Sequence, residues 1–143
     1  MFDSSHFHPM IVHFPVALII VGFLADLTSL FIKSEKCLSK AGYYLMVLGA
    51  LAAMAAWLTG KFFTFEPDQG EIVKIFEKHE TAALITTLVM ITGALLRIYL
   101  VVKRKEETSL KWVVFCFYLL GFISVSVTGF LGGTMVFNYM MGI

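Results

Sequence analysis

Four long apolar runs, separated by short polar segments, dominate the pattern of this chain. They cover approximately residues 9–32, 42–63, 70–103 and 110–138. Each run reaches the length of about 20 residues that an α-helix needs to cross a bilayer, and all four are too long and too uniformly apolar for barrel strands. Backbone groups inside lipid must be paired within the spanning element. The pattern therefore predicts an all-α membrane protein, a single antiparallel bundle of four transmembrane helices.

The composition supports a membrane protein and excludes other classes. Of the 143 residues, 59% are hydrophobic and only 15% are charged, too few to cover the surface of a soluble domain. The formal net charge of +1 gives no sign of a nucleic-acid partner. We therefore expect the lipid bilayer itself to be the main surrounding of the chain.

Lysine and arginine are distributed unevenly over the connections between the runs. Three of them, Lys61, Lys74 and Lys78, lie on the side of the two termini. The opposite side carries eight: Lys33, Lys36, Lys40, Arg97, Lys103, Arg104, Lys105 and Lys111. Short cytoplasmic loops are enriched in these residues. The sequence thus predicts a multi-pass protein of the bacterial cytoplasmic (inner) membrane, with both termini on the periplasmic side.

The connection between the second and third runs is the only long one, from Thr64 to Lys78. Asp68 is followed three residues later by Glu71, a spacing that resembles a helix capping box. The third helix is therefore expected to begin about two turns before it enters the membrane.

Three histidines gather at the predicted periplasmic face. His8 and His13 lie at the start of the first helix, and His79 lies at the start of the third. Pro15 has no amide proton, so it should kink the first helix just below His13 and turn that side chain toward the bundle axis.

Neutral imidazole is a common ligand of haem iron and of transition metals, and a bundle places such ligands on facing helices. A haem b needs ligands from two helices, which makes His13 and His79 the axial pair, with His8 as an alternative ligand or rim contact. A non-haem transition metal ion bound by His8, His13 and His79, with Glu80 or water completing the shell, is the second interpretation. The third is that these histidines only cap helices or bind carbonyl groups.

Asp26 and Arg97 are the only strong charges well inside the apolar runs. Arg97 follows His79 by 18 residues, which is about five full turns, so both lie on one face of the third helix. Asp26 has a similar depth on the first helix. We therefore predict a structural Asp26–Arg97 ion pair rather than a proton relay, with snorkelling of Arg97 to the inner surface as the alternative.

Glycines are frequent on the fourth helix. Gly129 and Gly133 have the small-xxx-small spacing that allows close contact between helices, and this face also permits a homodimer. The missing side chains at Gly132 and Gly133 would equally admit a flat porphyrin between helices. Close helix packing is the simpler explanation.

Several segments together carry a family resemblance: HPMIVHFPVAL, WLTG, the His-Glu pair at 79 and 80, Arg97, and GxLGGxxVxxxxxG near the end. With these segments the chain resembles the bacterial membrane family called domain of unknown function 2231 over nearly its full length. The resemblance implies a four-helix membrane module of the kind found alongside c-type cytochrome or Rieske-type domains, and hence a redox setting. Carried onto this chain, it marks His8, His13, Asp26, His79, Arg97, Gly132 and Gly133.

The leading functional prediction is a b-type haem protein that transfers electrons near the periplasmic face, with periplasmic or membrane redox proteins as partners. Its alternatives are a metal-binding or transport protein that uses the same histidines, and a cofactor-free structural subunit. No nucleophile with an adjacent base, phosphate-binding loop or paired catalytic carboxylates stands out, so we predict no catalytic residues and no independent enzyme.

Overall fold

The computed structural model describes residues 7–64 and 66–139, which form four α-helices. These are α1 (Phe7–Phe31), α2 (Lys36–Phe63), α3 (Glu71–Val102) and α4 (Leu110–Tyr139). All four are long and apolar enough to cross a membrane. Within the described ranges no strand occurs, so the predicted all-helical membrane protein with four spans is confirmed.

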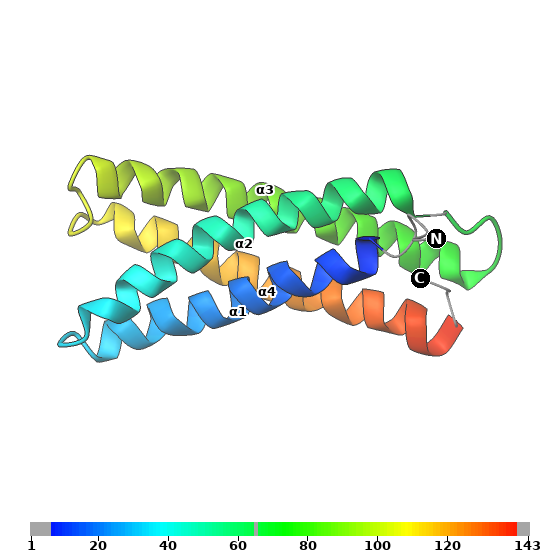
Figure 1. Ribbon diagram of the computed structural model, residues 1–143, viewed down its shortest axis with the longest axis horizontal. Coiled ribbons are helices and arrows are strands. Elements are labelled where there is room, and N and C mark those ends of the chain that lie inside the picture. Colours follow the sequence, from blue (N-terminus) through cyan, green and yellow to red (C-terminus); the bar gives the residue numbers. More distant parts are fainter. Residues whose placement is uncertain (1–6, 65, 140–143) are drawn as a thin grey trace.

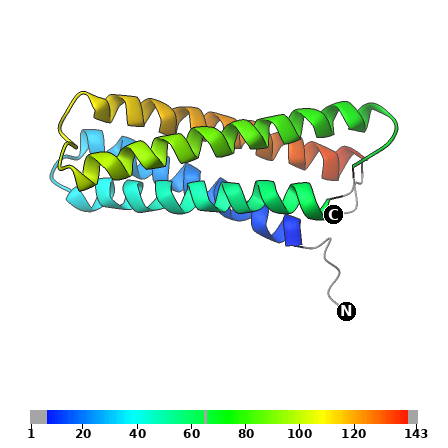
Figure 2. The same cartoon turned by 90° about the horizontal axis from the view of Figure 1, so that it is seen from above.

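The helices form one elongated bundle, and each runs in the opposite direction to the helix before it (Figure 1). The largest interfaces join α1 to α2 and α3 to α4, while the α2–α3 and α1–α4 interfaces are smaller. Toward the end where α1 begins and α4 ends, these two helices diverge in both views (Figures 1 and 2). That end of the bundle carries His8 and His79.

The core at mid-height is apolar and closely packed. Ile19, Met46 and Met90 are fully buried there, one each from α1, α2 and α3. A side chain at Gly93 would meet the Met46 methyl group at 2.6 Å, and one at Gly121 would overlap the Met90 sulfur. The unbranched thioether of methionine suits such irregular spaces. The missing side chains at Gly93 and Gly121 therefore leave the space that Met46 and Met90 occupy.

The outer surface of the bundle is as apolar as its interior. Many large hydrophobic side chains are about half exposed or more, for example Phe14, Leu24, Leu88 and Ile123. In water such a surface would aggregate, but lipid chains solvate it without cost. The exposed apolar belt is what four membrane-spanning helices require.

Two helix starts differ from the expectation. α2 begins at Lys36, six residues before the expected start at residue 42, because the polar segment before the apolar run is itself helical. α3 begins at Glu71 with Gly70 as the N-cap, and no side chain caps it, so the capping box from Asp68 does not form. Gly70 has φ of +88°, a left-handed conformation that glycine adopts without strain.

Candidate histidine site and buried ion pair

His8 is held against α2 by a hydrogen bond. Its Nδ1 lies 3.3 Å from Thr59 Oγ1. The Thr59 hydroxyl donates its own proton to the Ala56 carbonyl group at 3.0 Å, so the Thr59 oxygen accepts the proton of His8 Nδ1. In a neutral ring, the lone pair then resides on Nε2.

His79 is held against α4 in a corresponding way. Its Nδ1 lies 3.0 Å from the main-chain carbonyl oxygen of Thr128. A carbonyl oxygen only accepts, so Nδ1 carries the proton, and Nε2 of the neutral ring again carries the lone pair. Both histidines therefore have the tautomer in which Nε2 carries the lone pair that can accept a proton or bind a metal.

Each ring packs on a glycine. A Cβ atom at Gly60 would lie 2.9 Å from His8 Cε1, and one at Gly132 would lie 3.2 Å from His79 Cε1. The two rings, from α1 and α3, are close enough to interact electrostatically. Burial lowers the pKa of His8 below its ordinary value of 6.5, and the nearby His79 lowers it further.

The other predicted site residues are not part of this arrangement. His13 is exposed, and α1 stays helical through the buried Pro15, so the proline does not turn His13 toward the bundle axis. Five residues separate His13 from His8, about 500° of helical rotation, which places them roughly 140° apart on α1. Gly133 has open space at its Cβ position.

Glu80 is engaged by a lysine instead of by histidines. Its carboxylate binds the Lys61 ammonium group at 2.7 Å and so links α3 to the end of α2. Among the residues that the structure describes, no three His, Cys, Asp or Glu side chains are grouped to hold a metal ion. The expected cluster of His8, His13, His79 and Glu80 is thus not assembled, and the described structure brings together only His8 and His79.

A chain of hydroxyl groups lies below His79, between α3 and α4. Thr86 Oγ1 is 2.7 Å from Ser124 Oγ and 3.3 Å from Thr128 Oγ1. The sequence did not indicate these contacts, because they join residues that are 38 and 42 positions apart along the chain. Thr86 and Thr128 also bind main-chain carbonyl groups of their own helices, those of Ala82 and Ser124, so the hydroxyl groups join α3 to α4 beside His79.

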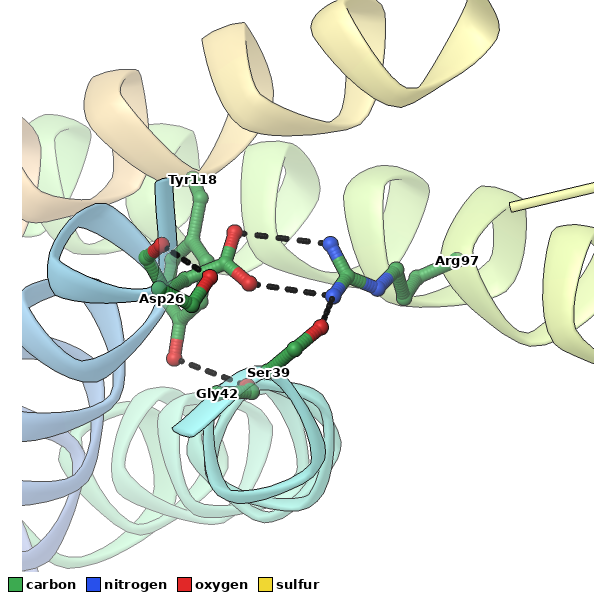
Figure 3. Close-up of polar contacts among 6 residues, drawn as sticks. Asp26, Ser39, Gly42, Arg97 and Tyr118 are labelled. Carbon is green, nitrogen blue, oxygen red and sulfur yellow. Dashed lines mark hydrogen bonds and ion pairs between the residues drawn. The ribbon is translucent and has the colours of Figure 1, made fainter. Parts of the chain in front are cut away.

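The predicted ion pair forms in the other half of the bundle. Arg97 Nη2 lies 3.0 Å from one Asp26 carboxylate oxygen, Nη1 lies 3.4 Å from the other, and Nη2 also donates to Ser39 Oγ at 3.3 Å (Figure 3). Only 6% of the Asp26 side chain and 11% of the Arg97 side chain are exposed. Arg97 therefore turns inward and does not snorkel.

Tyr118 completes this network from α4, and sequence reasoning missed it. Its hydroxyl donates to the Gly42 carbonyl group at 3.3 Å, beside Asp26 (Figure 3). Side chains at Gly22 and Gly42 would overlap Tyr118 and Asp26, respectively. The feature of the sequence that could have indicated this packing is the recurrence of glycines near the depth of the intramembrane charge.

A comparison with protein families supports the membrane assignment, whereas no curated protein and no solved structure matches the chain. The family model described as a predicted membrane protein, DUF2231, matches residues 5–143. That match includes the histidine pair, the ion pair and all four helices. The chain is therefore a member of the DUF2231 family of predicted membrane proteins.

Proposed function

We propose that this protein binds a b-type haem at the periplasmic end of the bundle, with His8 and His79 as axial ligands. His8 takes the place that sequence reasoning gave to His13. The observation that carries the proposal is the shared anchoring of both rings through Nδ1, which leaves two Nε2 lone pairs on different helices. Histidine ligands of metals commonly donate their other ring proton to a carbonyl or similar acceptor.

The number of ligands favours haem over a bare metal ion. A structural zinc site needs four protein ligands and a catalytic one three. Two imidazoles suffice for haem, because the porphyrin occupies the other four positions around the iron. The described residues supply two histidines and no third group of the kind that binds metals, so this donor set fits haem better.

A bound haem would supply reversible one-electron chemistry. His8 and His79 would hold it from α1 and α3, and the missing side chains at Gly60 and Gly132 let the two rings pack against α2 and α4. Electrons would pass to or from redox proteins in the periplasm or membrane. The excess of lysine and arginine on the opposite side supports an inner-membrane orientation with both termini periplasmic.

A transport function is less well supported. A transport route needs polar groups along the bundle axis. Here the hydroxyl groups near His79 and the Asp26–Arg97 pair are separated by the fully buried apolar side chains of Ile19, Met46 and Met90. The structure gives no observation that favours transport over electron transfer.

The test is an absorption spectrum of the purified full-length protein, expressed with haem supplied, before and after reduction with dithionite. We expect a Soret band and a sharp reduced α band that are lost in His8→Ala and in His79→Ala. His13→Ala, at an exposed position of the same helix, is the matched control and should keep both bands.

Loss of the bands in His13→Ala but not in His8→Ala would reassign the ligand. A colourless wild-type protein from haem-replete cells would reject haem binding. Metal analysis of that sample would then separate the two remaining alternatives, because the metal-binding function requires bound metal that His8→Ala removes, whereas a cofactor-free subunit contains none.

A further inference from the structure

An open groove of about 540 Å³ lies at the outer end of the seam between α3 and α4. Its polar rim consists of Glu77, Lys78 and Thr81 on α3. Below the rim, the small side chain of Ala82 leaves space between Ile85 of α3 and the α4 residues Val127 and Leu131. The groove is thus polar at one end and apolar along the rest.

The depth of the groove matches the headgroup boundary of a bilayer. Ala82 lies 20 residues before Val102, the last residue of α3, which is about 30 Å of helix and the thickness of a hydrocarbon core. Lys78 lies four residues further out, about 6 Å above that boundary, where lipid phosphate groups lie. The apolar part of the groove accordingly faces the acyl chains.

The rim presents one positive and one negative charge side by side. Glu77 and Lys78 are both exposed, and neither side chain forms an ion pair within the described part of the chain. Lys61, Glu66 and Glu80 at this end are engaged with one another, since Lys61 binds Glu80 and approaches Glu66. Glu77 and Lys78 therefore remain available to a ligand that itself carries both charges.

We propose that this groove is a binding site for one phospholipid with a primary-ammonium headgroup, as in phosphatidylethanolamine. Lys78 binds the phosphate, Glu77 accepts hydrogen bonds from the ammonium group, and one acyl chain lies along Ile85, Val127 and Leu131. An anionic glycerol headgroup lacks the ammonium and is repelled by Glu77. A choline headgroup has no N–H to donate. This site does not depend on the proposed haem.

The experiment is native mass spectrometry of the full-length protein released from nanodiscs that contain equal amounts of phosphatidylethanolamine, phosphatidylglycerol and phosphatidylcholine. An exposed ion pair gives only a modest preference, so we expect about a threefold excess of retained phosphatidylethanolamine over each of the other two lipids. Equal retention of the three lipids, or an excess of either of the other two, would overturn the proposal.

Two variants assign the roles of the rim residues. Glu77→Gln should remove the preference for phosphatidylethanolamine over phosphatidylcholine, and Lys78→Gln should reduce retention of all three lipids. Glu71→Gln and Lys74→Gln change the same charges on the exposed outer turns of α3 and should leave the wild-type pattern unchanged. An equal effect of these control variants would show a general charge effect and reject the site. All four positions are exposed, and a thermal melt of each variant checks that it folds.

Discussion

The guanidinium group of Arg97 contacts both carboxylate oxygens of Asp26, and through this pair the C-terminal half of α3 is joined to α1. Ser39 of α2 adds a third partner, and Tyr118 of α4 lies against the pair while it donates to Gly42. All four helices therefore meet at one polar cluster. Because a displaced helix would separate these buried polar groups, the cluster restricts how deep each helix sits relative to its neighbours.

Breaking the pair from one side should be costly. Asp26→Leu leaves Arg97 buried without a counter-charge, and Arg97→Met does the same to Asp26, so each should lower stability by about 3–5 kcal/mol. The double variant Asp26→Leu/Arg97→Met leaves no buried charge and should recover most of the loss. Equilibrium unfolding in mixed micelles measures this cycle. Additive losses in the double variant would mean that the two groups do not interact.

The packing of Tyr118 on Gly22 gives a second prediction. A methyl group at Gly22 would overlap the Tyr118 hydroxyl and approach Leu45 Cβ at 2.6 Å, so Gly22→Ala should destabilise the protein by about 1–3 kcal/mol. Gly133→Ala is the matched control, because nothing lies within 4 Å of its Cβ position. Thermal melts in detergent should show a lower midpoint for Gly22→Ala alone; equal midpoints for both variants would contradict the packing described.

His8 should make the cofactor-free protein less stable in acid. Burial and the nearby His79 lower the pKa of His8, so the folded state binds its proton less readily than the unfolded state does. The stability that the neutral, buried His8 contributes is fully present above the ordinary pKa of 6.5. It is lost as the pH falls through the lowered pKa of the folded state. Melting temperatures between pH 7.5 and pH 5 should fall less in His8→Gln than in wild type. His13→Gln, at an exposed position, should keep the wild-type slope.

The hydrogen bond from His8 to Thr59 should tune the proposed haem site. Thr59→Val removes the oxygen that accepts the Nδ1 proton, and loss of such an outer partner typically weakens metal binding by about tenfold or more. Haem titration of the apo protein measures the change. Thr92→Val, whose hydroxyl bonds only the Leu88 carbonyl of its own helix at an exposed position, should bind haem as wild type does.

The orientation can be tested with the native cysteines. Cys37 is exposed one residue after the start of α2, on the lysine-rich side, and should react with a membrane-impermeant maleimide in inverted vesicles but not in intact spheroplasts. Cys116 lies within the span of α4, so a Cys116→Ser background leaves Cys37 as the reporter. Labelling in spheroplasts would reverse the proposed orientation.

The depth of the charged residues could be predicted from the sequence, but their full surroundings could not. Asp26 and Arg97 stand out because a charge inside an apolar run needs a partner, and each was the only candidate for the other. Tyr118 and Ser39 gave no comparable signal, since a tyrosine in an apolar helix or a serine near a loop has many unremarkable roles. Only packing between helices brings their oxygens to the pair.

For the histidines, too, the sequence predicted the depth in the membrane but not the surroundings of each side chain. The apolar runs, their lengths and the positions of His8, His13 and His79 along them determined that all three lie at one end of a four-helix membrane protein, because hydrophobic length dictates what spans a bilayer. Only the tertiary structure decided that His8 faces Thr59 and Gly60 while His13 is exposed. That choice depends on the rotation of α1 about its own axis. Close contacts with α2 decide this rotation. The sequence does not predict it, because an almost uniformly apolar helix has no polar face that marks which side is exposed.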